Sequence, residues 1–185
     1  MNILAIDTST DAITLGLAIG DKKVYYTGEK GCKKHNSTLL QYIDDKLRKN
    51  GVSIRDIDVF GVVRGPGSFT GIRIAVATAN ALAMGVDAKI VEVTSLEQMF
   101  DGTDQLVLLD CGHDHYYAAI AEQGKEPLYT EISVEQLSSY SMKKCFLTIS
   151  DPEKILAKCV EKAGKGLFVK QATPFYMKQS SAERQ

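Results

Sequence analysis

The feature that most constrains the fold is a short apolar segment, followed by a glycine-rich turn and then an apolar helix. Residues 59–63 have the composition of a buried strand, and residues 64–71 read Arg-Gly-Pro-Gly-Ser-Phe-Thr-Gly. Pro66 suits the second position of a type II turn, and Gly67 allows the positive φ that the third position requires. A helix over about residues 71–84 follows. Three strands precede this unit, and strands alternating with helices follow them, which indicates a layered α/β fold with a mixed sheet and flanking helices.

Weaker signals extend this mixed α/β fold in both directions. Residues 3–6, 13–19 and 23–27 predict an antiparallel meander, because turn residues separate their apolar segments. A capping box at Thr38 predicts the start of a first helix, which Asn50-Gly51 ends. The remaining predicted elements are strands at residues 89–93, 105–109, 117–122 and 145–149, a short helix capped by Ser95, and a helix that begins at Asp151-Pro152.

Composition excludes several classes of protein. The 185 residues are 44% hydrophobic and 24% charged, which suits two small lobes, assigned here to residues 1–100 and 101–185. The 22 basic and 23 acidic residues give no overall positive field that would indicate nucleic acid or an anionic membrane. Four cysteines without a C-x-x-C pair argue against a zinc ribbon. The absence of a signal-peptide pattern or a long apolar run predicts a cytoplasmic protein.

Two segments carry groups that bind phosphate in other folds. A carboxylate and three hydroxyls follow the first strand, and the helix after the glycine-rich turn offers free N–H groups to an anion. The spacing differs from both the dinucleotide fingerprint and the P-loop, so ordinary turns capped by their own side chains are the alternative. Residues 110–112 form another acidic turn with the same two interpretations. The candidate phosphate-binding residues are Asp7, Thr8, Ser9, Thr10, Gly65, Gly67, Ser68, Thr70, Gly71 and Arg73.

The helix after the glycine-rich turn is apolar on two sides. One side carries a stripe of small residues that lets another helix approach closely, and the other side can lie on the sheet. We predict a partner interface formed by this stripe and the first helix; the alternative is that the stripe is buried within the chain itself. The predicted interface residues are Leu39, Leu40, Ile43, Leu47, Ile72, Ala75, Val76, Ala79 and Ala83.

No catalytic or metal-binding residue is predicted. His113 and His115 lie close together on a predicted turn, but no third ligand stands at a recognisable spacing. His35 would need a second ligand four residues later to form a metal pair on a helix, and that position is Leu39. The G-x-S-x-G motif of a nucleophile elbow is absent.

Several motifs resemble those of the TsaB (YeaZ) family in order and spacing. The resemblance rests on residues 3–10, His35 with Leu39 and Leu40, residues 65–74 and residues 93–96, with weaker similarity near Leu109-Asp110, Tyr117 and residues 174–177. It implies the fold shared by actin, Hsp70 and sugar kinases (ASKHA), here with a short second lobe. The chain departs from the family pattern at residues 110–112 and at Asn80, where relatives commonly carry Lys.

The resemblance also implies a function. Members of this family pair with a metal-bearing paralogue, TsaD, and with a small ATPase, TsaE, to install the N6-threonylcarbamoyl group on adenosine 37 of tRNAs that read ANN codons. This chain would be a non-catalytic subunit without a cofactor of its own, because ATP or ADP and the metal belong to the partners. It would contact tRNA mainly through the complex and could form a homodimer when alone.

Two alternatives remain open. The first is an ATP-dependent phosphotransferase or ATPase of the ASKHA fold, which would use the two acidic turns to hold phosphates. The second is that lysines near the C-terminus, which recur at helical spacing, contact tRNA phosphates. The simpler interpretation of these lysines is a helix face exposed to solvent. These lysines are Lys154, Lys158, Lys162 and Lys165.

Overall fold

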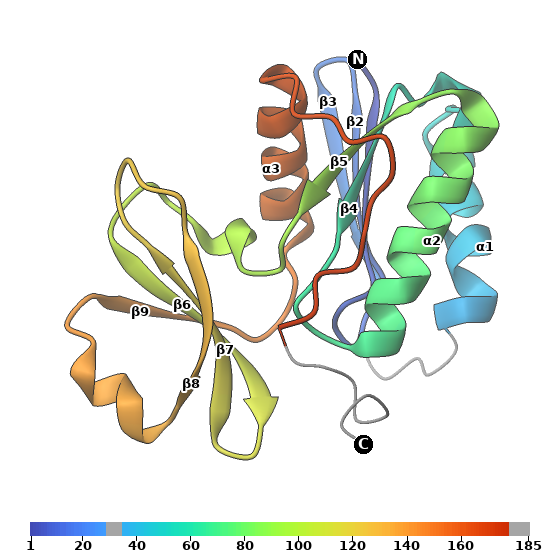
Figure 1. The fold of residues 1–185 in the computed structure, drawn as a ribbon. Coiled ribbons are helices and arrows are strands. Elements are labelled where there is room, and N and C mark those ends of the chain that lie inside the picture. The colour runs from blue at the N-terminus through green and yellow to red at the C-terminus, as the bar shows by residue number, and fades with distance from the viewer. Residues whose placement is uncertain (29–34, 178–185) are drawn as a thin grey trace.

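The first sheet forms because its central strands, which are short and almost wholly buried, alternate their side chains between two covered faces. In this computed structural model, which describes residues 1–28 and 35–177, β1 places Leu4 and Ile6 on one face and Ile3 and Ala5 on the other. The sheet order is β3-β2-β1-β4-β5, with β1 antiparallel to β2 and parallel to β4 (Figure 1). Its strands are β1 (Ile3–Asp7), β2 (Thr14–Ile19), β3 (Lys22–Thr27), β4 (Val59–Val63) and β5 (Lys89–Val93).

Helices cover both faces of this sheet, which gives three layers. Helices α1 (His35–Lys49) and α2 (Phe69–Val86) pack on the face that carries Leu4 and Ile6. Helix α3 (Pro152–Gly164) packs on the opposite face (Figure 1). The first lobe therefore has two separate apolar cores, one on each side of the sheet.

Glycines in two central strands let α3 lie close to the sheet. A Cβ atom added at Gly61 would lie 2.2 Å from the Sγ of Cys159, and one added at Gly16 would lie 2.7 Å from the Cβ of Leu156. Both distances are shorter than real Cβ contacts, so a side chain at either position would push α3 away. Cys159 and Leu156 are fully buried at this contact.

The second sheet repeats the order of four strands of the first. Its order is β8-β7-β6-β9, in which the two hairpin pairs are antiparallel and β6 is parallel to β9, as β1 is to β4. This duplicated arrangement confirms the predicted ASKHA fold, although the sequence shows no internal repeat. The strands are β6 (Gln105–Gly112), β7 (His115–Ala121), β8 (Leu128–Ser133) and β9 (Lys143–Leu147), and short 3-10 helices lie at Ile54–Asp56, Glu97–Met99 and Glu135–Ser139.

After β9 the chain returns to the first sheet. Helix α3 packs against β1, β2, β4 and β5, although the division made from the sequence assigns residues 101–185 to the second lobe. The second sheet is therefore built by residues 105–147 alone. The physical reason is that the face carrying Ile3 and Ala5 needs an apolar cover, which the buried side of α3 supplies.

Residues 169–177 form an extended segment, called here the C-terminal strap. Val169 pairs with Ile90 at the edge of β5, and Ala172 is buried in the core beneath α2. Figure 1 shows the strap passing between the first sheet and α2 toward the second sheet. Met177 packs in the cluster that holds Leu96, so the strap joins the two lobes.

Several element boundaries differ from the sequence prediction. Helix α1 begins at His35, which places Thr38 inside the first turns and not at a cap. Helix α2 runs through Gly85 to a left-handed Asp87. The short helix after β5 has Leu96, and not Ser95, as its N-cap, and Glu97 N donates to the Oγ1 of Thr94. Strand β8 was not predicted, because polar residues interrupt its apolar pattern.

By length and mean hydropathy, α2 is the one helix in the described residues that would suffice to cross a membrane. This finding differs from the expectation that no apolar run in the chain approaches a transmembrane length. The buried side of α2 packs against the first sheet, and a core helix passes the same test, so this is weak evidence for a membrane span.

Candidate functional site

The turn after β1 and the glycine-rich loop before α2 are hydrogen-bonded to each other. Ser68 N donates to Ser9 O at 2.8 Å, and Thr8 Oγ1 donates to Gly71 O at 2.6 Å. Asp7, Thr8 and Ser9 are almost completely buried. The structure thus brings the two predicted phosphate-binding segments together as the two sides of one packed junction.

Close backbone contact explains two glycines of this junction. A Cβ atom at Gly71 would lie 1.8 Å from Thr8 O, and one at Gly67 would lie 2.6 Å from Ser9 O. Gly67 also has a φ of 153°, which disfavours other residues. These glycines are therefore required by the neighbouring turn, whether or not a phosphate binds.

Two amides in the first turn of α2, those of Gly71 and Ile72, have hydrogen-bond acceptors within the chain. Ser68 is the N-cap of α2, and its Oγ accepts from Gly71 N at 3.3 Å. Ile72 N donates to Ser68 O at 2.8 Å. The Gly65–Pro66 peptide bond is cis, which the predicted type II turn does not include. Phosphate binding here stays a prediction, with Ser68, Thr70 and Arg73 as the exposed members of the predicted set.

The second acidic turn closes the hairpin between β6 and β7. Gly112 N donates to the Oδ1 of Asp110 at 2.7 Å, and His113 and Asp114 both have positive φ, near 56° and 57°. His115 Nδ1 lies 2.7 Å from His113 O. These local bonds agree with the simpler interpretation of a turn stabilised by its own side chains.

Among the described side chains, those of residues 1–28 and 38–177, no three of His, Cys, Asp or Glu lie close enough together to hold a metal ion. Leu39, at the position where a second helix ligand would stand, is 1% exposed and packs in the core beneath α1. The side chain of His35 lies outside the described part of the chain. The face of α1 on which a second metal ligand would stand is therefore apolar at this position.

The predicted partner interface needs correction, because all of its residues except Leu40 are buried in the core of this chain. They cover the sheet face formed by Leu4, Phe60 and Val62, and none of them is more than 4% exposed. The alternative interpretation, in which these residues are buried within the chain itself, is therefore the correct one. The buried residues are Leu39, Ile43 and Leu47 of α1 and Ile72, Ala75, Val76, Ala79 and Ala83 of α2.

The exposed side of α2 is a different stripe, called here the outer α2 face. It comprises Thr70, Arg73, Ala77, Ala81 and Met84, which recur at three- and four-residue spacing and so share one side of the helix. Met84 is 84% exposed. On α1, Leu40 is 59% exposed. The outer α2 face thus combines small and apolar side chains with one arginine.

That arginine is held by two aromatic rings. The guanidinium carbon of Arg73 lies 3.8 Å from the centre of the Phe69 ring, and its Nε donates to the hydroxyl of Tyr176 at 2.8 Å. The rings of Phe69 and Tyr176 stack with their centres 4.8 Å apart. Sequence reasoning placed Arg73 among the phosphate residues and missed this cluster, because Tyr176 comes from the distant strap.

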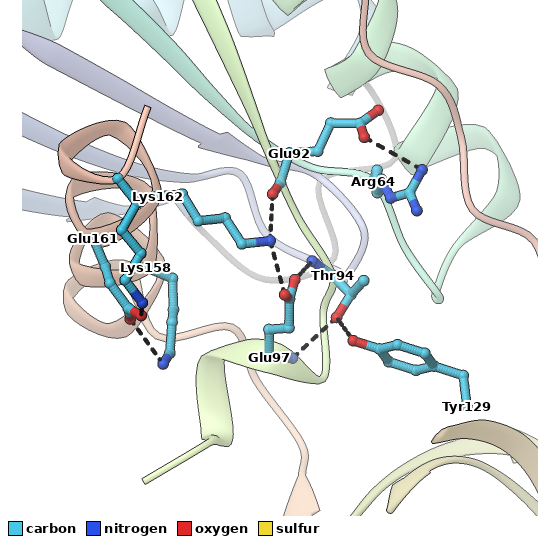
Figure 2. A network of polar contacts seen from close by, with 9 residues as sticks. Arg64, Glu92, Thr94, Glu97, Tyr129, Lys158, Glu161 and Lys162 are labelled. Atoms are coloured by element: carbon cyan, nitrogen blue, oxygen red, sulfur yellow. Dashed lines mark hydrogen bonds and ion pairs between the residues drawn. The ribbon is translucent and has the colours of Figure 1, made fainter. Parts of the chain in front are cut away.

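A polar network joins the two lobes (Figure 2). Arg64 pairs with Glu92 at 3.4 Å, and Lys162 of α3 pairs with Glu97 at 2.8 Å. These residues border a cavity of about 290 Å³ between β5, α3 and the start of β8. The residues of the network are far apart in the sequence, so no local motif could reveal it.

Tyr129 connects this network to the second sheet. Its hydroxyl lies 3.1 Å from the Oγ1 of Thr94, as Figure 2 shows, and its ring meets that of Phe175 edge-on with centres 5.3 Å apart. Burial, with a smaller contribution from the negative charge of Glu97, raises the pKa of Tyr129 to about 12. The tyrosine is therefore neutral at physiological pH and serves as a contact between the lobes.

The lysines of α3 are largely paired with acids. Lys162 lies in the network just described, while Lys158 and Lys165 both pair with Glu161, at 3.2 and 2.7 Å. Lys154 lies 4.0 Å from Asp151 at the helix start. This pairing favours the solvated-face interpretation of the helix over phosphate contact.

Comparison with protein families gives one match that spans most of the chain. The family model described as "TsaD: tRNA N6-adenosine threonylcarbamoyltransferase" matches residues 28–180. The chain is 29% identical over 139 residues to the tRNA threonylcarbamoyladenosine biosynthesis protein TsaB of Haemophilus influenzae, covering 75% of this chain and 57% of the relative. It is 38% identical over 102 residues to TsaB of Escherichia coli, covering 55% of this chain and 44% of the relative. The chain thus spans about half the length of the curated relatives it matches.

Solved structures with the same fold include a Pseudomonas aeruginosa protein described as uncharacterized with similarity to peptidase YEAZ. That protein has a TM-score of 0.79 and 21% identity, covering 96% of this chain and 99% of its own. YeaZ from the same organism has a TM-score of 0.77 and 21% identity, covering 95% of this chain and 99% of its own. At this identity the likeness concerns the fold.

Proposed function

Because the chain belongs to the TsaD family of tRNA N6-adenosine threonylcarbamoyltransferases, and within it to the TsaB (YeaZ) group, we propose that it is a non-catalytic subunit of the threonylcarbamoylation system. It pairs with a metal-bearing TsaD-like paralogue, and a TsaE-like ATPase completes the system. The complex modifies adenosine 37 of ANN-decoding tRNAs in the cytoplasm, and the chain contacts tRNA through its partner. ATP or ADP and the metal are bound by the partner subunits.

The observation that carries this proposal is the junction between the β1 turn and the glycine-rich loop. A phosphotransferase of this fold would need these segments to face a nucleotide phosphate, but Ser68 N and Gly71 N donate to oxygens within the chain. Thr8, which would be a phosphate ligand, donates to Gly71 O. The buried Leu39 supports the same conclusion for metal chemistry, because a leucine cannot act as a ligand.

A subunit without its own chemistry must act through a surface, and the outer α2 face is the best candidate. Ala77 and Ala81 are small enough to let a partner helix approach closely, while Met84 offers an exposed apolar side chain. Leu40 adds a large exposed apolar residue on α1. The same face would support a homodimer when the paralogue is absent.

Reconstitution tests this function. Unmodified ANN-decoding tRNA would be incubated with the activated threonylcarbamoyl donor, the TsaD-like paralogue and the ATPase encoded in the same genome, with and without this chain. We expect modification only when the chain and the paralogue are both present. Modification by the chain alone, or an unchanged rate without the chain, would contradict the proposal. Stoichiometric ATP binding by the isolated chain would favour the phosphotransferase alternative.

A further inference from the structure

The most unusual charged group on the outer α2 face is Arg73. Its guanidinium lies over the Phe69 ring, and its Nε is fixed by the hydroxyl of Tyr176. Stacking and one hydrogen bond restrict the side chain before any partner arrives, so less conformational entropy is lost on binding. The arginine is therefore preorganised although it is exposed.

Arg73 has no carboxylate partner among the described residues, while Arg48 and Arg64 both form ion pairs. An arginine carries five N–H donors, and the bond to Tyr176 uses only the one on Nε. The two terminal nitrogens keep their donors in a planar fork. That fork matches the two oxygens of one carboxylate.

The groove beside Arg73 suits a ligand with a single negative charge and not one with a row of negative charges. Arg73 borders a shallow groove of about 350 Å³ whose other lining residues are Phe69, Thr70, Ile74, Ala77 and Thr78. None of these five carries a charge. Arg73 also borders a larger groove of about 930 Å³, whose other charged lining residues, Asp87 and Lys170, have opposite charges. A nucleic acid backbone is bound by several cations together, whereas a single arginine in an apolar groove suits a single carboxylate.

We propose that Arg73 anchors the partner by binding an aspartate or glutamate side chain of the paralogue end-on, with Phe69 and Tyr176 as its positioning residues. This inference rests on the proposed function, and it deepens it by naming the residue that selects the partner. It also gives Arg73 a different ligand from the phosphate that the sequence suggested. Close helix packing at Ala77 brings the carboxylate within reach.

The first test compares the affinities of Arg73→Gln, Arg73→Lys and the wild type for the paralogue. Loss of the charge is expected to weaken binding by about 30-fold or more, as at a desolvated hot spot. Lysine keeps the charge but loses the planar fork, so an intermediate loss of about tenfold is expected. Lys165→Glu serves as control, because α3 lies on the opposite face of the sheet.

A second measurement separates a binding role from a structural one. Arg73→Gln should keep the circular dichroism spectrum and melting temperature of the wild type, and its modification rate should reach the same plateau at higher concentrations of the chain. Tyr176→Phe, which keeps the ring and removes the acceptor for Nε, should give a several-fold loss of affinity. Arg73→Glu should be rescued by replacing the paired acid of the paralogue with arginine.

The outcomes distinguish the two proposals. If the wild type binds the paralogue and folded Arg73→Gln binds it equally well, the role of Arg73 is wrong and the proposed function stands. If Arg73→Gln lowers the affinity of the complex for tRNA and leaves the affinity between the subunits unchanged, the ligand is a phosphate and this inference fails. If the wild type does not bind the paralogue, both proposals fail.

Discussion

The side-chain amide of Asn80 holds the backbone of Ala172 at two points. Its Oδ1 accepts from Ala172 N at 2.8 Å, and its Nδ2 donates to Ala172 O at 3.0 Å. Asn80 stands on α2, and Ala172 is the buried residue of the C-terminal strap. This pair therefore fixes the strap against the helix that we propose as the partner surface.

Asn80→Leu should loosen the strap without unfolding the chain. The substitution leaves both backbone groups of Ala172 without their partners, which costs about 2–4 kcal/mol of unfolding free energy. Hydrogen exchange should show faster exchange at the amides of residues 172–176 than in the wild type. Asn50→Leu, which removes side-chain bonds to Lys46 O and Tyr26 at the far end of α1, is the control and should leave strap exchange unchanged.

Ala79→Glu and Ala81→Glu should affect different properties, the fold and the partner affinity, although they introduce the same charge two residues apart. Ala79 is fully buried against the sheet, so a glutamate there would unfold the first lobe or force it to rearrange, at a cost of several kcal/mol. Ala81 is exposed, so its variant should keep its fold and weaken pairing with the paralogue. Circular dichroism and analytical ultracentrifugation measure the two effects. A stable Ala79→Glu protein would contradict the assigned burial.

This pair of alanines also shows what the sequence can and cannot predict. The strand at residues 59–63, the helix that follows it and the antiparallel strands at residues 3–27 follow from local patterns. The cis Gly65–Pro66 bond and the parallel pairing of β1 with β4 do not. The choice between the two apolar sides of α2 does not, because both sides satisfy the same periodicity. Only contact with Phe60 and Val62 decides that Ala79 faces inward. The network of Arg64, Glu92 and Lys162 is equally invisible, because tertiary packing alone brings its members together.

Gly61→Ala should destabilise the chain strongly, because the new methyl group would lie 2.2 Å from Cys159 Sγ and would displace α3. We expect a loss of about 2–4 kcal/mol in urea denaturation. Gly85→Ala is the matched control: no atom lies within 4 Å of the added methyl group, and alanine favours a helix. That variant should be more stable by up to about 1 kcal/mol. Equal stabilities for the two variants would refute the close packing of α3.

The stability of the chain should fall as the pH rises above about 9. Burial raises the pKa of Cys159 from its ordinary value of 9.0 to about 12. Between these values the native state keeps a proton that the unfolded state has released, so the free energy of unfolding decreases with increasing pH. Cys159→Ala should reduce this slope in urea titrations at pH 8 to 11. A slope unchanged by the substitution would assign the effect to other groups.

Lys162→Ala and Lys165→Ala should differ in their effect on stability, because Lys162 is part of a tertiary network and Lys165 faces solvent. Lys162 bonds to Glu97 and to the carbonyl of Glu92 in a partly buried setting, and its loss should cost about 1–3 kcal/mol. Lys165 is mostly exposed, and its loss should leave thermal stability unchanged. Neither variant should alter the salt dependence of tRNA binding by the complex. A reduced salt dependence would show that α3 contacts phosphates after all.

The return of α3 to the first sheet has a consequence for the order of folding during synthesis. The face of that sheet formed by Ile3, Val59 and Val91 has its cover only in residues 152–164, which leave the ribosome after the whole second sheet. Until then a nascent chain carries an apolar sheet surface with nothing to close it. The second sheet, by contrast, pairs all four of its strands within residues 105–147. The later part of this sequence can therefore form its strand ladder before the part that is made first completes its core.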